Sequence, residues 1–304
     1  MRRLITRRRL VVLAGAAAIL VVVLGTLWRS AIRRNRGMAD EPFRIAGNLY
    51  YVGGAGVTSF LLTGPEGHVL IDGGYPESAS AIVASIARLG FDIADVKVLL
   101  NTHAHADHAG GLRELQEASG AELWISDGDA AVIADGGAHD PTLVPQKYLG
   151  FLGLGKFPAP HVDHTFADGA TIRLGPLALT AHVTGGHTPG CTSWSFPVQD
   201  GDRELLAVDV CSLTLLPFIS LVEPETYPGI RSDFEHSFSV LRSLPADIFL
   251  ASHSSWFGLT RKFGQRADAE NPADPFIDRA GYLAFIDREE ATFRQALAKQ
   301  EGRR

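Results

Sequence analysis

Short hydrophobic runs alternate with amphipathic segments along the chain beyond residue 40. Apolar runs bounded by turn residues predict strands over residues 48–52, 58–63, 68–72, 96–100 and 121–125, and again over 171–174, 177–183, 192–197, 204–210 and 247–251. Apolar residues at helical spacing predict helices over residues 82–89, 112–118, 130–134 and 233–244, and another from about residue 278. Strands followed by helices, twice over, indicate two related α/β halves that pack sheet against sheet with helices outside. We expect one domain over residues 41–304.

A different pattern occupies the first 36 residues. Residues 10–28 form a run of nineteen residues without a charge, and arginines flank the run on both sides. As a helix it would be about 28 Å long, close to the hydrocarbon thickness of a bilayer. We expect a transmembrane anchor here. The alternative is a cleaved export signal, because residues 6–10 resemble a twin-arginine motif. Both predict an exported protein on the periplasmic side, held to the inner membrane in the first case.

Charge divides the chain at the same point. Residues 1–36 contain nine arginines and no acidic residue, whereas the rest of the chain has 19 basic against 34 acidic residues, a formal charge of −15. A domain this acidic repels phosphate backbones, so no nucleic-acid partner is expected. With a hydrophobic fraction of 46% and only two cysteines, the chain is neither disordered nor a disulfide scaffold.

Eleven histidines are a high number for this chain, and three of them lie in one hexapeptide. His103, His105, Asp107 and His108 follow directly after the apolar run 96–100. In an extended segment residues i and i+2 point the same way, so His103 and His105 can bind one metal ion. As the chain turns towards the next helix, Asp107 and His108 are directed towards a second ion. The alternative is an unrelated polar loop, but these are the residue types of a metal site.

Two further histidines follow predicted strands at comparable positions. His187 comes shortly after the run 177–183, and His253 comes directly after the run 247–251. Taken alone, His187 or His253 would be interpreted as a loop or capping histidine and not as a metal ligand. Together with the hexapeptide they give six ligands, enough for two sites with three protein ligands each. Three protein ligands with an open position are the arrangement of catalytic zinc, whereas structural zinc sites are closed.

These residues resemble the metallo-β-lactamase superfamily, and most closely the third subclass of the class B β-lactamases, whose zinc ligands are His and Asp alone. The resemblance covers essentially all of residues 41–304 and is carried by the stretches 101–111, 117–121, 182–194, 248–259 and 274–282. It implies an αββα four-layer sandwich with metals at the ends of the sheets. It also implies two Zn²⁺ ions per chain, the first on His103, His105 and His187 and the second on Asp107, His108 and His253.

The resemblance further implies hydrolysis of the β-lactam amide bond by a hydroxide held between the two zinc ions, because zinc lowers the pKa of bound water to about 7. Asp107 would orient this nucleophile besides binding metal. No Gly-x-Ser-x-Gly motif occurs anywhere in the chain, so serine hydrolysis has no support. The expected partner is therefore a small molecule, a β-lactam, and we expect the enzyme to act as a monomer.

The segment 208–214 distinguishes the β-lactamases from their relatives. Glyoxalase II-like thioesterases and lactonases of this superfamily bridge their metals with an aspartate on this strand, whereas the third subclass carries a serine that helps to hold the substrate carboxylate. Ser212 fits that serine, with Thr214 as a second hydroxyl on the same side. Side chains alternate across a strand, so Ser212 and Asp209 should face opposite ways. We favour Ser212. If Asp209 faces the metals instead, a lactonase or thioesterase is the better interpretation.

Cys191 and Cys211 lie at equal distances from residue 201, in a turn between two predicted antiparallel strands. A hairpin centred there would place the cysteines opposite each other or one step apart, where a disulfide is geometrically possible. An exported protein can form such a bond. Two buried free thiols are an equal alternative.

Other residues have less specific patterns. Phe151 and Phe157, in the long loop 140–163, are expected to contact substrate at the rim of the cleft. Asp72 ends a strand and is expected to support a ligand histidine from behind. Residues 53–56 lie between two predicted strands, which favours a hairpin turn over a phosphate-binding loop. We expect surface or capping roles for the histidines outside the ligand set, at positions 68, 139, 161, 164, 182 and 236.

A non-enzymatic hypothesis is also compatible with these motifs, namely a zinc-binding or sensing module tethered at the membrane. It predicts metal ions whose coordination is closed entirely by protein. Six candidate ligands for two ions argue against it, since each ion then keeps an open position.

Overall fold

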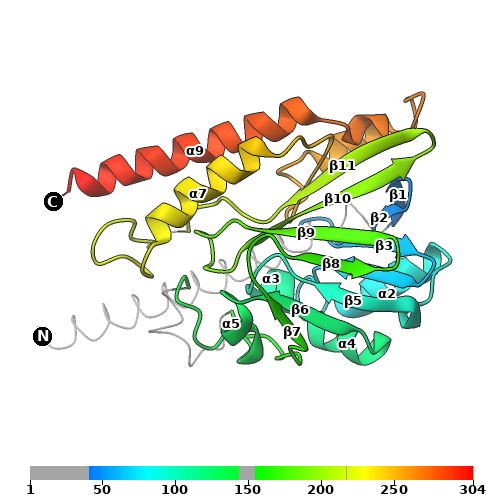
Figure 1. Ribbon diagram of the computed structural model, residues 1–304, viewed down its shortest axis with the longest axis horizontal. Helices are drawn as coiled ribbons and strands as arrows, with labels where there is room; N and C mark the ends of the chain where they lie inside the picture. Colours follow the sequence, from blue (N-terminus) through cyan, green and yellow to red (C-terminus); the bar gives the residue numbers. More distant parts are fainter. Residues whose placement is uncertain (1–40, 144–154, 217, 304) are drawn as a thin grey trace, which may run out of the picture.

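Two β-sheets face each other in the computed structural model of the protein, which describes residues 41–143, 155–216 and 218–303 (Figure 1). The first sheet has seven strands in the order β1 to β7, and the second has five in the order β12-β11-β10-β9-β8. Helices α2, α4 and α5 lie outside the first sheet, and α7 and α9 lie outside the second (Figure 1). The αββα sandwich expected from the sequence is confirmed.

The first sheet begins with antiparallel hairpins and continues with parallel strands. Its strands are β1 (Phe43–Ala46), β2 (Leu49–Tyr51), β3 (Phe60–Gly64), β4 (Gly67–Ile71), β5 (Val96–Leu100), β6 (Glu122–Ser126) and β7 (His164–Phe166). Strands β4 to β7 run parallel, so their carboxyl ends lie at one edge of the sheet. Ligands bind at this edge in open α/β sheets. The sequence pattern did not predict β1 and β7, because edge strands of four and three residues are too short to show a period.

The second sheet is a meander closed by one parallel strand. Its strands are β8 (Thr171–Leu174), β9 (Leu177–Val183), β10 (Thr192–Asp200), β11 (Arg203–Val210) and β12 (Ile248–Ala251). The predicted hairpin is confirmed, because Asp200 pairs with Arg203 across a turn in which Gly201 has a φ of 62°. That left-handed conformation suits glycine, which has no Cβ to clash. Strand β12 pairs in parallel with β11, so their carboxyl ends also meet at one edge.

The helices cover the outer faces of the sheets or connect the strands. They are α2 (Ala79–Arg88), α3 (Ala106–Ala109), α4 (Leu112–Ser119), α5 (Ala130–Ala134), α7 (Ile230–Ser243), α8 (Leu259–Gln265) and α9 (Arg279–Glu301), and short 3-10 turns lie at Ile93–Asp95 and Asp274–Phe276. Helix α9 begins at Asp278, whose carboxylate accepts a hydrogen bond of 2.9 Å from the Gly281 amide. This N-cap satisfies an amide that the helix leaves without a partner.

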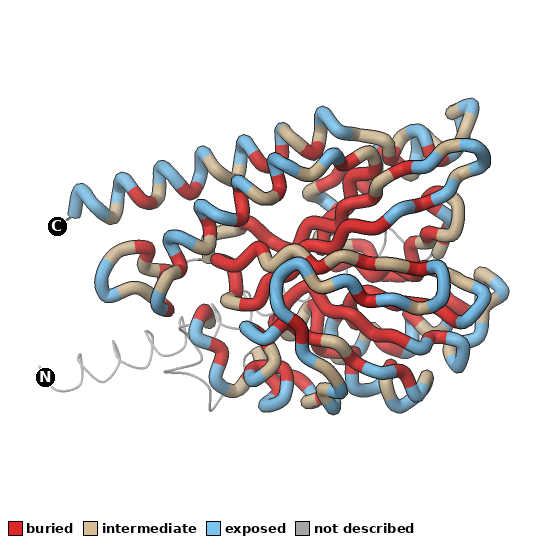
Figure 2. Tube along the Cα trace, viewed as in Figure 1, coloured by how far each residue is buried: buried red, intermediate tan, exposed pale blue. Residues whose placement is uncertain are grey.

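Burial follows the layers (Figure 2). One hydrophobic cluster fills the space between the two sheets and extends under α7 and α9, with Trp194, Phe249 and Phe285 among its largest members. A second cluster lies between the first sheet and its helices, and includes Ile86 and Leu115. These two hydrophobic clusters hold the layers together, and the packed layers position the loops at the sheet edge.

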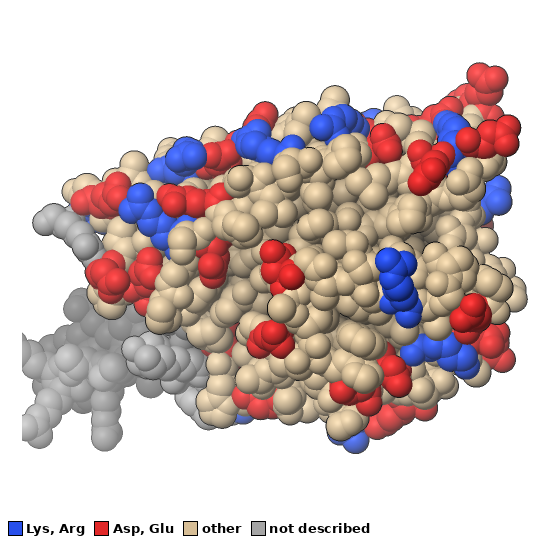
Figure 3. All heavy atoms as spheres, viewed as in Figure 1, with Lys and Arg blue, Asp and Glu red and all other residues tan. Residues whose placement is uncertain are grey.

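Charged side chains of both signs are interspersed on the face shown in Figure 3, and neither sign forms a continuous patch there. Ion pairs also connect α7 with α9. Arg231 lies 3.0 Å from Glu301, and Arg242 lies 2.5 Å from Asp287. Exposed pairs of this kind each contribute little to stability, roughly 0–1 kcal/mol.

Among the described residues, none of the helices combines the length and the apolar character needed to span a bilayer. The anchor predicted at residues 10–28 lies outside the described residues, and so does Phe151. Both therefore remain predictions.

Candidate metal centre

The hexapeptide with three histidines connects β5 to α3 at the carboxyl edge of the first sheet. His105 is the N-cap residue of α3 and has an extended backbone, with φ −95° and ψ 151°. The chain then turns past two glycines that lack room for a side chain. A Cβ at Gly110 would lie 2.3 Å from the Ala106 carbonyl oxygen, and one at Gly111 would lie 2.3 Å from that of Gly73. The close approach of these backbones directs the hexapeptide into the interior.

Three buried histidines converge from two loops. His103 and His105 come from the hexapeptide, His187 comes from the loop after β9, and one ring nitrogen of each lies within 4.8 Å of the others. The His187 Nε2 atom lies 3.1 Å from the His105 Nδ1 atom. Around a tetrahedral zinc ion with bonds of about 2.1 Å, neighbouring nitrogens are about 3.3–3.4 Å apart. This three-histidine group therefore fits zinc.

A second set of donors lies next to it. The Nε2 atoms of His108 and His253 are 3.3 Å apart, and the Asp107 carboxylate lies 3.5 Å from the first and 3.7 Å from the second. These spacings also fit one small tetrahedral ion. We call Asp107, His108 and His253 the mixed group. The structure thus brings all six predicted ligands together in two sets of three.

Each histidine of the three-histidine group has a partner on its other ring nitrogen. His187 donates from Nδ1 to the Thr214 carbonyl oxygen at 2.8 Å, and the His103 Nδ1 atom lies 3.1 Å from the Thr102 hydroxyl. The His105 Nε2 atom lies 3.1 Å from both the Thr142 hydroxyl and the Asp140 carboxylate. Such partners fix the ring orientation and leave the opposite nitrogen for metal. No periodicity or residue spacing points to Asp140 or Thr142, because both lie in an irregular loop.

The mixed group is supported mainly by Asp72. Its carboxylate lies 2.9 Å from the His108 Nδ1 atom and accepts hydrogen bonds of 2.7–2.8 Å from Thr102 and from the Asn101 amide. The predicted supporting contact of Asp72 is therefore confirmed. His253 is held by the loop 53–57, since it hydrogen-bonds the Gly56 backbone and pairs with Val57 in a β-bridge. Residues 53–56 connect the antiparallel strands β2 and β3 and form no phosphate-binding loop before a helix.

Asp129 joins the loops that carry the first set of histidines, and sequence reasoning missed it. Its buried carboxylate accepts hydrogen bonds of 2.8–2.9 Å from the Ala104 amide, the Thr188 hydroxyl and the Gly190 amide. Burial nevertheless raises the pKa of Asp129 above its ordinary value. Because the bonds cross between residues 104 and 190, only the tertiary structure reveals this role.

Burial and neighbouring charge set the protonation of the ligands. Burial lowers the pKa of His103 well below its ordinary value, that of His187 to about 3 and that of His253 to about 4. Burial also opposes the charged form of His108, but the carboxylates of Asp107 and Asp72 outweigh it and raise the pKa of His108 to about 10. The His108 side chain in turn lowers the pKa of Asp107, against the effect of burial.

Ser212 and Thr214 lie beside the three-histidine group. Their hydroxyl oxygens are 2.9 Å apart, and the Thr214 hydroxyl lies 3.2 Å from the His187 Nδ1 atom. Strand β11 ends at Val210, so alternation of side chains does not govern the segment that follows. Their role in holding a substrate carboxylate remains a prediction.

Asp209 lies within β11, opposite Trp194, and is only 1% exposed. Burial and the neighbouring Asp72 carboxylate raise the pKa of Asp209 well above its ordinary value. Among the described residues, Asp209 belongs to neither group of converging ligand atoms. Asp209 is thus close enough to Asp72 and His108 for their charges to act on it, and neither of its carboxylate oxygens has a hydrogen-bond partner within the described part of the chain.

Cys191 and Cys211 form a disulfide, with Cα atoms 6.0 Å apart, so no free cysteine is present. The register of β10 and β11 leaves the two residues one step from direct opposition. The Cys211 Sγ atom lies 3.6 Å from the His103 Nδ1 atom. The disulfide thus lies directly behind the three-histidine group, and its sulfurs are not available as metal ligands.

Two other expectations concern residues away from the ligands. Phe157 is 7% exposed and belongs to the hydrophobic cluster that contains Val132 and Ile133, so its predicted contact with substrate has no support from its position and remains a prediction.

The expectation of a surface or capping role is wrong for His68. This residue is 8% exposed on β4 and packs edge-on against Phe91, because β4 is buried along its whole length.

Comparisons with known proteins agree with this geometry. The sequence profile of the metallo-β-lactamase superfamily matches residues 52–201. The native FEZ-1 metallo-β-lactamase from Legionella gormanii is 38% identical, with a TM-score of 0.81 over 86% of this chain and 97% of that one. BJP-1, a subclass B3 metallo-β-lactamase of Bradyrhizobium japonicum, is 35% identical, with a TM-score of 0.76 over 86% and 95% of the two chains.

Curated relatives found by sequence are more distant. A hydroxyacylglutathione hydrolase of Jannaschia sp. (strain CCS1) is 24% identical over 64% of this chain, and the N-acyl homoserine lactonase AttM of Agrobacterium fabrum is 27% identical over 50%. The matches span only 60% and 64% of the lengths of these two relatives.

Proposed function

Because this chain belongs to the metallo-β-lactamase superfamily, we propose that it is a hydrolase that opens the β-lactam ring with two Zn²⁺ ions. One ion would be held by the three-histidine group and the other by the mixed group. The spacing of the donors and their hydrogen-bonded second nitrogens support this assignment.

The observation that carries the proposal is the pair of hydroxyls beside His187. Ser212 and Thr214 offer two hydroxyl groups next to the ligands, where relatives acting on lactones or thioesters would place a bridging aspartate. Asp209, the carboxylate near the end of this strand, is buried, and it is in none of the clusters of metal-capable side chains among the described residues. Similarity to FEZ-1 over 97% of that enzyme supports the same assignment.

The side chains have separate tasks in this reaction. When bound, zinc supplies a Lewis acid for the carbonyl oxygen and lowers the pKa of water so that it attacks at neutral pH. The Asp107 carboxylate is ionised, because His108 lowers its pKa, and it accepts a hydrogen bond that orients the attacking water. The hydroxyls of Ser212 and Thr214 donate hydrogen bonds to the carboxylate of the substrate. Asp72 and Asp129 hold the loops, so that the ligands need not rearrange as the reaction proceeds.

Turnover of matched substrates tests the proposal. The full chain, expressed with zinc, is assayed on a carbapenem, an acyl-homoserine lactone and a glutathione thioester. We expect rapid carbapenem hydrolysis that a chelator abolishes. Rapid lactone or thioester turnover without carbapenem hydrolysis would overturn the proposal.

A lactonase or thioesterase is the second candidate, favoured by the similarity to the hydroxyacylglutathione hydrolase and to AttM. The two candidates differ in which residue near the end of β11 matters. In a β-lactamase, Ser212→Ala raises the KM for the carbapenem, because a hydrogen bond to the substrate carboxylate is lost. If the enzyme instead hydrolyses lactones and Asp209→Asn abolishes that activity, the second candidate is correct.

We further propose that the catalytic domain works outside the cytoplasm, anchored to the inner membrane by residues 10–28. The Cys191–Cys211 disulfide supports an oxidising compartment. Cell fractionation of the full chain and of a variant with three arginines in place of Leu20, Val21 and Val22 tests the anchor. We expect the full chain in the membrane fraction and the variant outside it. An unchanged distribution would contradict the anchor.

A further inference from the structure

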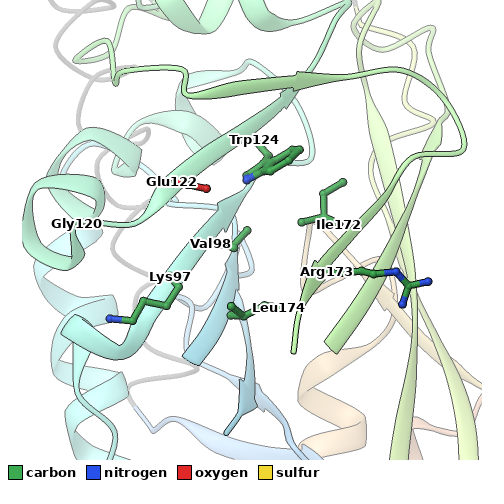
Figure 4. Close-up of a pocket in the computed structure, with 8 residues that line it drawn as sticks. All are labelled: Lys97, Val98, Gly120, Glu122, Trp124, Ile172, Arg173 and Leu174. Carbon is green, nitrogen blue, oxygen red and sulfur yellow. The ribbon is translucent and has the colours of Figure 1, made fainter. Parts of the chain in front are cut away.

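Two hollows in the described surface differ in their relation to the metal ligands. The first has a volume of about 350 Å³ and lies between β8 and the amino ends of β5 and β6, away from the ligand edge. Its two basic side chains, Lys97 and Arg173, point outward on opposite sides (Figure 4). Because these charges do not converge, the hollow offers no site for an anion.

The second hollow has a volume of about 780 Å³ and adjoins the mixed group. We call it the α2 groove, because helix α2 forms one wall and the loop 52–57 forms another, with His253 at one end. Tyr75 also lines this end. Burial and the nearby carboxylates of Asp107 and Glu77 raise the pKa of Tyr75 to about 12, so the end of the groove lies next to the mixed group.

The walls of the α2 groove change character along its length. Glu77 lines the near end, where Asp107 of the mixed group is close enough to act on Tyr75. Apolar side chains such as Val57 and Ile82 line the middle, and Arg88 lines the end formed by the last turn of α2. The Arg88 guanidinium folds back one turn and donates a hydrogen bond of 3.3 Å to the Ser85 hydroxyl. None of the described carboxylates forms an ion pair with it. The groove thus offers a positive charge after an apolar stretch.

The dimensions of the helix define the ligand that fits. Ser85, the partner of the guanidinium, is seven positions along the chain from Ser78 at the near end, which corresponds to about 10 Å along the helix axis. An extended six-carbon diacid linked to the amine of a β-lactam ring spans roughly 8 Å, by the usual reach of a chain of such bonds. The negative charges at the near end repel an anion placed there, whereas Arg88 attracts one at the far end.

We propose that the α2 groove binds the acyl side chain of the β-lactam and that Arg88 selects side chains that end in a carboxylate. This rests on the proposed function and names its substrate class: β-lactams with an anionic acylamino chain of about six carbons. Arg88 is a specificity-determining residue here and takes no part in the chemical step.

A matched pair of substrates tests the proposal. One cephalosporin carries an adipoyl chain and the other a hexanoyl chain on the same ring system, so they differ only in the terminal carboxylate. For the full-length zinc enzyme we expect Arg88→Gln to lower kcat/KM for the adipoyl substrate about tenfold, through KM, because a partly exposed charged contact is lost. The hexanoyl substrate should change less than twofold. Arg113→Gln, which removes an exposed cation on α4, is the control and should change neither.

A second variant tests the groove independently of charge. Ala84 lines the exposed side of α2, and Ala84→Phe would fill the apolar stretch. We expect the KM of both cephalosporins to rise at least fivefold, while a carbapenem without a long acyl chain is unaffected. Equal adipoyl-to-hexanoyl ratios in the parent enzyme and in Arg88→Gln would overturn this inference alone. Absence of turnover with every β-lactam would overturn the proposed function, and this inference with it.

Discussion

The three-histidine group and the mixed group lie side by side but are built from different surroundings. His103 and His187 hydrogen-bond uncharged oxygens, from a hydroxyl and a carbonyl, whereas His108 lies between the carboxylates of Asp72 and Asp107. The pKa of His187 is lowered to about 3, and that of His108 is raised to about 10. The two groups have the same number of candidate ligands, but His187 is neutral and His108 is protonated at neutral pH before metal binds.

The difference indicates how each group would take up metal. At neutral pH the rings of His103 and His187 are neutral, so their lone pairs are free for a metal ion. His108 is protonated in the metal-free protein and must release its proton before it binds metal. We therefore expect the three-histidine group to fill first and the mixed group to depend more strongly on pH.

Loss of a ligand from the three-histidine group should have the largest effect. We expect His105→Ala to lower hydrolytic activity about 10³-fold, since metal stabilisation worth several kcal/mol is lost. Metal analysis should show about one zinc ion fewer per chain. His139→Ala, at an exposed histidine, is the matched control. If His105→Ala retained both its zinc content and its activity, His105 would not be a metal ligand.

The disulfide lies next to His103 of the three-histidine group. Replacing both Cys191 and Cys211 by alanine should lower the free energy of unfolding by about 3 kcal/mol, as for a loop of this length in the chain-entropy view. Urea unfolding of the zinc-free protein measures it. We expect zinc affinity to weaken at the three-histidine group and to stay unchanged at the mixed group. Equal weakening of both would show that the disulfide acts on the whole domain.

Asp72 contacts His108 of the mixed group directly, whereas it is connected to His103 only through the Thr102 hydroxyl. We expect Asp72→Asn to lower zinc affinity there by 10–100-fold, because an outer partner of a ligand histidine is weakened. Competition with a chromophoric chelator measures the two affinities separately. Thr142→Ala, next to His105, should instead affect the three-histidine group. If Asp72→Asn and Thr142→Ala weakened zinc binding at the same group, Asp72 and Thr142 would not support different groups.

Changes in pH should produce the smallest effect. The raised pKa of His108 means that zinc displaces a proton at every pH below about 10, so affinity at the mixed group should rise up to tenfold from pH 7 to pH 8. His103 and His187 are deprotonated throughout this range and contribute no such rise. Zinc titrations at the two pH values check this. A flat affinity at the mixed group would show that His108 is neutral before metal binds.

Local pattern was sufficient for most of the fold. Strands β5, β8 and β9 and helix α5 have the bounds that the hydrophobic pattern predicted, because each is long enough or apolar enough to show its period. The edge strands β1 and β7 were not predicted, because strands of four and three residues are too short to show a period. His68 was placed wrongly because a single polar residue in a buried strand does not reveal what packs against it.

The candidate site was predictable only in part. The hexapeptide brings four ligands together through local geometry alone, so the spacing of His103, His105, Asp107 and His108 was sufficient. The positions of Ser212 and Asp209 did not follow from strand alternation, because β11 ends before Ser212. Asp129 and Asp140 were not predicted, since their partners lie 25 or more residues away in the chain.

The sequence by itself determined the layered fold, the six candidate ligands and the supporting role of Asp72, because these depend on short-range periodicity and on residue types at strand ends. Only the tertiary structure decided that Cys191 and Cys211 form a disulfide next to His103, that Asp209 is in none of the clusters of metal-capable side chains among the described residues, and that Arg88 and His253 line one groove. These features arise where segments far apart in the chain pack together, and packing depends on the whole fold.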